Sequence, residues 1–445
     1  MSYLDNFRIQ FIIINLIWSD IMKKKKAIRD YVLISLFIVV TIVLSFISFP
    51  LPTTNYNFVG FANMHRGLEL GGGIKNTYTM EVADWYKGSK EQAYNDALTR
   101  VQNILNKYYA DASAYFSEED KITIEVPDSA ISESLTTSFF EIKSAEGESA
   151  ETKLDGRDIN KAEYTSAGTT YGVYIEFTDE GTKKLRELTS EVSANNGSIY
   201  IYWNKDYENP VTLSISGQMD YIFLQGEGIS NKQAGELYAI RVESSKIGVN
   251  MTTDVDPIEV SPRFGDLSSI MIMVTTIVLV ISSIIVLYIL FRQLGLVSSL
   301  SLLFALMVST IISAIFDLQV TFYGWLGFVV GYLINFALHL YYLYVIKNEY
   351  AKGKKFTVSF TSSYKKALFN ILDINLITLG TILFMLIIPS SAIKMFVFNL
   401  LMTIPATAFT SMLLNKVVCV DYTAFNTKNE KKVRFIREEN LDENK

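Results

Sequence analysis

Among the titratable side chains inside long apolar stretches of this 445-residue sequence, two offer the most scope for chemistry. His339 carries an imidazole, which titrates close to neutral pH, and Asp373 carries a carboxyl group. An ionisable group inside a membrane-spanning segment is costly and is a functional candidate by default. Asn335 lies one helical turn before His339, and Asn375 follows Asp373 by two residues. These four residues are our candidates for a proton relay.

Each candidate also has a structural alternative. His339 could serve in packing or at a helix interface, and Asp373 could hydrogen-bond to neighbouring helix ends near the inner membrane surface. Asn375 could support Asp373 or cap a kink. Gly324 and Gly327 form a small-x-x-small face, which lets a second helix approach closely whether or not function is involved.

Metal and cofactor chemistry has few possible ligands in this sequence. The only histidines are His65 and His339, and the only cysteine is Cys419. Zinc and haem sites of the ordinary ligand types need more such side chains, so we expect neither a metal nor a cofactor. A single cysteine also excludes a disulfide within the chain. Cys419 is interpreted as a small apolar residue near a helix end.

Six apolar runs are long enough to cross a membrane, which takes a helix of about 20 residues. They cover residues 31–49, 267–291, 294–316, 321–346, 367–388 and 395–420. A seventh patch, residues 7–18, is shorter and carries polar residues, and residues 1–21 are a candidate misassigned extension ahead of a start at Met22. The sequence therefore predicts a membrane protein with six spans.

Basic residues beside the spans predict the orientation, because cationic segments are retained in the cytoplasm. They occur at Lys23–Lys26, at Arg292, in the loop 347–366 and at Lys428–Arg437. All of these segments fall on one side of a six-span arrangement. We therefore expect the N-terminal segment 1–30, the loop and the charged tail 421–445 to be cytoplasmic. The first span lacks a small-residue cleavage site and is expected to remain as an anchor.

The region between the first two spans, residues 50–265, is expected outside the cell. Residues 51–265 contain 33 acidic and 19 basic side chains, a net charge of −14, whereas the rest of the chain carries +8. A phosphate-binding surface needs a cationic patch, so no nucleic-acid partner is expected for this region.

Alternating apolar and polar residues in this external region predict strands at 122–126, 173–177 and 199–203. A capping box at Ser89 and Gln92 predicts a helix that runs to about Tyr108. A second helix is expected at 179–192, and a third begins at the capping box Ser230–Gln233. Strands and helices in this order favour a large α+β domain of ferredoxin-like units with split βαβ connections.

A glycine-rich run follows the first span and leads into a strand. It consists of Gly67, Leu68, Glu69, Leu70, Gly71, Gly72 and Gly73. Consecutive glycines allow tight or left-handed backbone and suit a hinge, although a simple turn is an alternative. A phosphate-binding loop is disfavoured, because the G-K-[ST] ending is absent and Glu69 would repel phosphate.

This run resembles the G-L-D-L-x-G-G motif that opens the external domain of the SecD family. Residues 260–265 (VSPRFG) resemble the V-G-P-x-L-G motif before the second SecD span, and residues 364–376 are similar to the family segment G-Y-[KR]-[RK]-A-x-x-x-I-x-D-A-N-L. Weaker similarity occurs at 156–162 and 177–181. The segments follow the family order across residues 30–420.

The resemblance implies a six-helix half-bundle of the resistance-nodulation-division (RND) type below the external domain. It implies a non-enzymatic accessory subunit of the Sec translocase, in the bacterial cytoplasmic membrane and in contact with its lipid. The implied partners are a SecF-type second half, the SecYEG channel and unfolded preproteins in late-stage export. In that family a proton gradient drives motion of the external domain.

The sequence departs from the family in the fourth span. The family aspartate falls on Ala337, and the asparagine after it falls on His339. On a helix His339 projects about 160° away from position 337, so it does not simply replace that carboxylate. Asp373, in contrast, matches an aspartate of the family motif. Two rival functions stay open, an RND-type exporter of small molecules or lipid and a proton-independent translocon scaffold.

Overall fold

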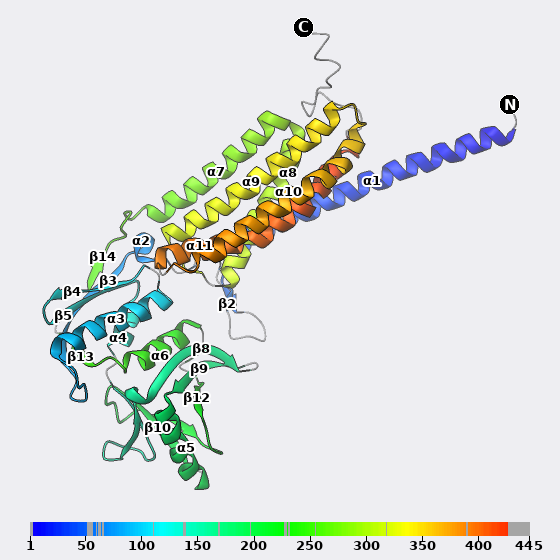
Figure 1. Ribbon diagram of the computed structural model, residues 1–445. Helices are drawn as coiled ribbons and strands as arrows, with labels where there is room; N and C mark the ends of the chain where they lie inside the picture. Colours follow the sequence, from blue (N-terminus) through cyan, green and yellow to red (C-terminus); the bar gives the residue numbers. More distant parts are fainter. Residues whose placement is uncertain are drawn as a thin grey trace. The chain divides into compact units, whose positions relative to one another are not determined.

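In the computed structural model the chain forms two compact units (Figure 1). One unit comprises residues 1–48, 59–65 and 269–445, and the other comprises residues 49–58 and 66–268. The structure describes residues 3–425 except 51–56, 59, 61–63, 65, 110, 137–138, 168–169, 196, 227–228, 230–231, 254, 317 and 389. The first unit is a helical bundle, and the second is a mixed α+β domain.

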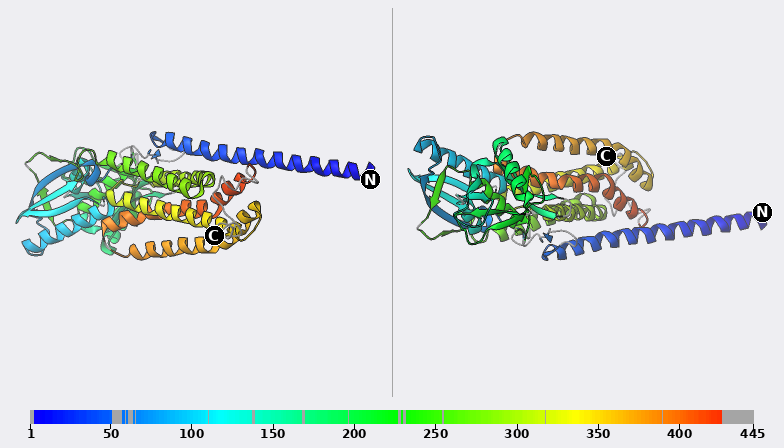
Figure 2. Two further views of the ribbon diagram at one scale, coloured as in Figure 1. Left: turned by 90° about the horizontal axis from the view of Figure 1, so that it is seen from above. Right: turned by 90° about the horizontal axis from the view of Figure 1, so that it is seen from below.

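The bundle is built from long helices that run side by side, with α1 extending beyond the others (Figure 2). They are α1 (Tyr3–Leu44), α7 (Ser268–Phe291), α8 (Gln293–Ile315), α9 (Phe322–Ala351), α10 (Phe356–Met385), α11 (Ser391–Phe409) and α12 (Asn415–Tyr422). Six segments of the described chain are long and apolar enough to cross a membrane, namely Ile21–Leu44, Ser268–Phe291, Gln293–Ile315, Phe322–Ala351, Phe356–Met385 and Ala392–Tyr422. The predicted six-span architecture is confirmed.

The helix ends differ from the apolar runs in two places. α1 ends at Leu44, and residues Phe49–Pro50 form strand β1, which pairs with β2 (Asn57–Phe58). The expected loop 347–366 is mostly helical, because α9 continues to Ala351 and α10 begins at Phe356. The rings of Tyr350 and Phe356 pack edge to face with 6.0 Å between centroids, which supports helix beyond the apolar runs.

The last span is interrupted. Pro405 lies inside α11, and the chain then passes through a π-helix, η3 (Thr410–Leu414), before α12. A proline lacks the backbone N–H of an α-helical hydrogen bond, and a π-helical turn holds an extra residue, so the register of side chains changes along this span.

The α+β unit contains a ferredoxin-like core. Its elements are β3 (Gly73–Val82), α3 (Lys90–Tyr108), β4 (Ser113–Glu118), β5 (Lys121–Val126), α6 (Lys232–Ser244) and β13 (Val249–Thr252). The strands form an antiparallel sheet in the order β13-β3-β5-β4, and β14 (Ile258–Val260) also pairs with β3. This order is that of two split βαβ units, which confirms the predicted fold class.

A second subdomain is inserted between β5 and α6. Helix α4 (Ser129–Leu135) follows β5 and packs in the core of the ferredoxin-like unit. The subdomain contains β6 (Phe140–Lys143), β7 (Thr152–Asp155), the short helix η2 (Gly156–Asp158), β8 (Ile159–Ala167), β9 (Thr170–Phe177), α5 (Asp179–Ala194), β10 (Ser198–Trp203), β11 (Val211–Ser214) and β12 (Tyr221–Leu224). The strands form two sheets, β11-β10-β6-β7 and β12-β9-β8. One apolar core that includes Ile142, Val173 and Leu185 joins them.

Side-chain caps mark the starts of the predicted helices. Ser89 accepts the backbone N–H of Gln92, and the Gln92 side chain accepts the backbone N–H of Ser89, so the capping box is confirmed. Thr178 caps α5 by accepting the N–H of Gly181 at 3.1 Å. The proposed cap Ser230 lies outside the described residues.

Candidate functional site

His339 lies in α9 in the interior of the bundle and is fully buried. Its Nδ1 atom is 2.8 Å from the backbone oxygen of Asn335, and its Nε2 atom is 2.8 Å from the Ser301 hydroxyl in α8. The Asn335 side-chain amide donates to Thr410 Oγ1, at the start of η3, over 3.2 Å. Two of the four proposed relay residues are therefore adjacent, and both contact other helices.

Asp373 lies in α10 with an exposed side chain, and it has no hydrogen-bond or ion-pair partner within the described part of the chain. Ala337 of α9 is also exposed. The Asn370 side chain of α10 donates to Tyr341 Oη of α9 at 2.5 Å. Residues 352–355 join α9 and α10, and the two helices pack against each other. Ala337 lies about one turn before Tyr341 in α9, and Asp373 lies about one turn after Asn370 in α10, so the two residues lie at the same height along the helix pair.

Asn375 is buried, and its amide donates to the backbone oxygen of Ile371 at 2.8 Å, one turn earlier in α10. A side chain that bonds to its own helix satisfies itself locally. The structure therefore separates the four candidates into an interior pair, His339 and Asn335, an exposed Asp373, and a locally bonded Asn375.

Gly324 and Gly327 face α11. A Cβ atom at Gly327 would lie 2.0 Å from the backbone oxygen of Phe396, and one at Gly324 would lie 2.7 Å from Nδ2 of Asn399. One turn further, a Cβ at Gly331 would lie 1.9 Å from Thr403 Oγ1. Because real Cβ atoms do not approach so closely, these glycines set the distance between α9 and α11.

The glycine-rich run 67–73 contains a short helix, α2 (Leu68–Gly71), and packs against residues 260–268. The backbone N–H of Phe264 donates to the oxygen of Glu69 at 3.3 Å, and the Ser268 hydroxyl donates to the oxygen of Leu70 at 3.0 Å. Gly72 has a φ of +69°, and a Cβ there would lie 2.5 Å from the oxygen of Val260. Two segments that resemble family motifs thus meet in space, and the run is packed rather than a free linker.

Asp111 was not identified from the sequence, yet it supports this run. Its Oδ2 atom accepts the backbone N–H of Glu69 at 3.3 Å, and a Cβ at Gly67 would lie 2.0 Å from the same atom. Burial raises the pKa of the Asp111 carboxyl, and hydrogen bonds from the backbone N–H groups of Glu69 and Leu68 act against that rise. No pattern around residue 111 marks it, because the contact spans 42 residues of sequence.

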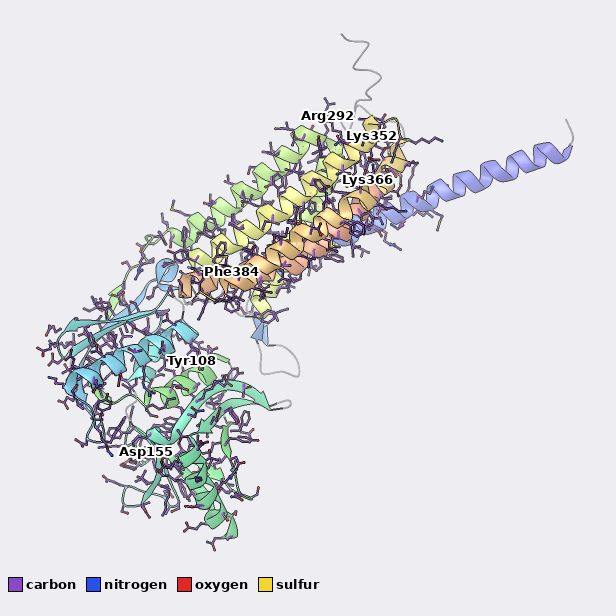
Figure 3. The ribbon with its side chains drawn as sticks, in the orientation of Figure 1. Tyr108, Asp155, Arg292, Lys352, Lys366 and Phe384 are labelled. Atoms are coloured by element: carbon purple, nitrogen blue, oxygen red, sulfur yellow. The ribbon has the colours of Figure 1, made fainter. Side chains whose placement is uncertain are left out.

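A cluster at one end of the bundle was also missed. Glu349 is buried at the end of α9 and pairs with Lys354, with Lys366 at 2.5 Å and with Lys352 at 3.5 Å. Figure 3 shows Arg292, Lys352 and Lys366 at the same end of the bundle and Phe384 at the opposite end. Positive charge therefore gathers at one end of the spans.

Among the described residues, no group of three or more histidine, cysteine, aspartate or glutamate side chains is close enough to hold a metal ion. The geometry instead offers buried hydroxyl, amide and imidazole groups in the bundle and an exposed carboxylate on its surface. The imidazole and the carboxylate can bind and release protons, whereas the hydroxyl and amide groups can only exchange hydrogen bonds.

The two units define a multi-pass membrane protein that carries a sheet-rich extramembrane domain. Within that class, the chain is similar to solved structures of SecDF. A SecDF crystal structure in a super-membrane-facing form aligns with a TM-score of 0.61 and 16% identity, over 90% of this chain and 58% of that chain. The chain therefore has the SecDF fold, as the sequence resemblance predicted, and spans 58% of the length of that structure.

Two further structures align less closely. SecDF from Thermus thermophilus, described as a translocon-associated membrane protein, has a TM-score of 0.47 and 17% identity over 89% of this chain and 59% of that chain. A SecDF structure described as a membrane component that enhances protein export has a TM-score of 0.30 and 14% identity, over 41% of this chain and 100% of that chain. No protein-family model matches the sequence, and no curated protein does.

Proposed function

We propose that this chain is a SecD-type accessory subunit of the Sec translocase that assists late-stage export of preproteins across the membrane. One observation carries the proposal, namely that 90% of the chain follows a SecDF structure with a TM-score of 0.61. The order of the sequence segments that resemble SecD motifs supports it independently. The role is non-enzymatic, with unfolded preproteins and the SecYEG channel as partners.

We further propose that a SecF-type second half covers the face of α9 and α10 that carries Ala337 and Asp373. A charged side chain at the centre of a span costs about 2.5–3.5 kcal/mol against hydrocarbon. Asp373 is exposed within the span Phe356–Met385, so a partner that offers a cation or a hydrogen-bond donor would remove that cost. The SecDF structure is also longer than the region that aligns, since this chain spans 58% of it.

The proposed orientation places both termini in the cytoplasm and residues 50–265 outside a bacterial cytoplasmic membrane. The cluster of Lys352, Lys354 and Lys366 at one end of the bundle supports it, because the positive end of a membrane protein faces the cytoplasm. Reaction of single cysteines at positions 217 and 353 with a membrane-impermeant reagent tests this: outside labelling is expected at 217 alone.

The proposed energy source for this role is the proton gradient. The alternative is that the chain is a scaffold that works without protons. Ala337 favours the scaffold, since it removes the family carboxylate, whereas Asp373 and His339 favour the motor. Translocation stimulated by this chain should fall when the proton gradient is collapsed. Stimulation that survives the collapse would favour the scaffold.

The experiment that tests the proposed function is depletion of the chain in its own host with two parallel readouts. We expect secretion and membrane-protein maturation to slow, and efflux of small molecules and lipid to stay unchanged. Re-expression of the chain should restore export. The opposite pattern, with normal export and impaired efflux, would favour the RND-type exporter and contradict the proposal.

A further inference from the structure

The interior of the bundle carries a set of buried polar side chains where apolar packing would be cheaper. It includes Ser298, Ser301, Ser309 and Ser313 of α8, Asn335 and His339 of α9, and Thr403, Thr407, Thr410 and Asn415 of α11, η3 and α12. Polar groups inside a span are costly unless they are bonded or hydrated. So many buried polar side chains in the interior that contains His339 indicate a function beyond packing.

The hydrogen bonds of His339 fit both protonation states of the ring. Nδ1 faces a carbonyl oxygen, which only accepts, so Nδ1 carries a proton in either state. In the neutral ring, Nε2 accepts from the Ser301 hydroxyl across 2.8 Å. In the charged ring, Nε2 donates to Ser301, whose hydroxyl then donates to the backbone oxygen of Ser298, also at 2.8 Å. Rotation of one hydroxyl therefore satisfies either state.

Two places for water lie beside the hydrogen-bonding partners of the ring, one next to Asn335 and one beyond Ser301. A cavity of about 10 Å³, close to the volume that one water needs, is lined in part by Ser309, Asn335, Thr403 and Thr407. On the other side, Ser298 donates to Asn415 Oδ1 at 2.8 Å. The Nδ2 atom of Asn415 is buried and has no hydrogen-bond partner among the described residues. Buried amide donors are nearly always bonded, so this atom points to a water molecule.

The π-helix η3 connects the two sides. Thr410, its first residue, bonds to Asn335, and Asn415, which follows its last residue, accepts from Ser298. Such π-turns occur mostly at functional sites, because the extra residue reorients side chains at some cost in backbone bonding. Here the π-turn lets one span contact the relay residues of both α8 and α9.

Tyr332 of α9 is buried and lines the same cavity. The remaining titratable groups near this set bond elsewhere or lie outside the interior. Cys419 of α12 donates to Asn415 Oδ1 at 3.4 Å, Tyr342 of α9 to the oxygen of Phe360, and Tyr31 of α1 to the oxygen of Val418. Lys416 lies over the ring of Tyr364, and Asp373 is exposed. Within the described residues, no carboxylate or ammonium group bonds to His339, so the ring has no charged partner.

We propose that His339 is a buried proton-binding site within this chain, which takes up and releases one proton at Nε2 through Ser301 and water beyond it near Asn415. Uptake converts the imidazole to imidazolium and adds one positive charge, while Nδ1 keeps its proton and continues to donate to the backbone oxygen of Asn335. The site lies in the interior of the six helices, away from the exposed Asp373. Its use in export rests on the proposed function, but the proton binding does not.

Histidine-specific NMR of the full chain in lipid bilayers tests the site, because the sequence contains only His65 and His339. A His65→Gln variant leaves one labelled ring. Between about pH 8 and about pH 4 we expect the neutral Nδ1–H form to convert reversibly to imidazolium. A ring that stays neutral in one tautomer throughout would overturn the proposal and leave a packing role.

Variants in α8 separate proton binding from packing. Ser301→Ala removes the hydroxyl that bonds to Nε2 in both states. It should lower the imidazolium signal at a given pH about fivefold, because the bond to the charged ring is stronger than the bond to the neutral ring. Ser299→Ala is the matched control, since this buried hydroxyl bonds only to the Leu296 oxygen of its own helix. An equal response to both variants would contradict the assigned role of Ser301. The measured quantity is the protonation state of the His339 ring. This test therefore stands even if the proposed role in export is wrong.

Discussion

At the scale of single residues, the sequence identified His339 and Asp373 but could not separate their settings. Both interrupt apolar runs, and hydropathy does not tell an interior face from an outer one. The structure buries His339 among hydroxyl groups and exposes Asp373 beside Ala337. Asp111 could not be found, because its partner Glu69 is 42 residues away and no local spacing links them.

We predict that Asp373→Asn slows export about tenfold without disturbing membrane insertion, since the amide keeps the size and loses the charge. Insertion is measured by protease protection and export by pulse-chase of a secreted protein. Thr381→Val is the control, because the Thr381 hydroxyl lies on the same helix and bonds only to the Ile377 oxygen. Normal export by the Asp373→Asn variant would remove Asp373 from the mechanism.

Asp111 should make the external domain less stable as the pH rises. Its pKa is raised in the folded state, so the protonated carboxyl favours folding. That contribution is complete below the ordinary pKa of about 3.9 and is lost as the pH rises through the raised value. Asp111→Asn keeps an oxygen for the Glu69 N–H and does not titrate, so its profile should lack this decline.

Hydrogen exchange of β3 and β5 in the full chain measures this stability against pH. Asp120→Asn, at the turn between β4 and β5, is the control and should behave as the unmodified chain does. Parallel profiles for the unmodified chain and Asp111→Asn would show that Asp111 does not contribute.

At the scale of helices and strands, the sequence pattern predicted the elements that are determined by residues close together in the chain. Strands β5, β9 and β10 lie where alternation placed them, and α3 begins at the predicted capping box. The extension of α9 to Ala351 could not be predicted, because it is supported by tertiary contacts such as those of Glu349 and Phe356. The η3 turn could not be predicted either, since its contact with Asn335 joins residues far apart in the sequence. The ferredoxin-like order was recognisable, although a whole subdomain separates β5 from α6.

The close approach of α9 and α11 gives a prediction at this scale. Gly327→Val would force a side chain into the Phe396 backbone, so the helices must separate, at a cost of about 1–3 kcal/mol. Thermal unfolding of the purified chain in detergent measures the loss. Gly380→Val in α10 is the matched control, because a Cβ there meets no atom within 4 Å. Equal destabilisation by both variants would show that the close α9–α11 contact at Gly327 does not contribute to the stability of the bundle.

At the scale of the whole molecule, the account requires a second membrane chain on the face of α9 and α10. Phe369 is 70% exposed on this part of α10. A photo-crosslinking residue at position 369 should capture one membrane protein of defined size in its native membrane. The same residue at Ile277 of α7, also exposed, is the comparison and should give mainly lipid adducts. Lipid adducts alone at position 369 would argue against a second half.

The most direct test of the central claim is the rate at which a secreted preprotein matures in cells depleted of this chain and complemented with it. The account predicts that depletion slows maturation at a late stage, with translocating chains held at the membrane, and that the intact chain restores the rate. Maturation that is equally fast with and without the chain would contradict a role in Sec-dependent export.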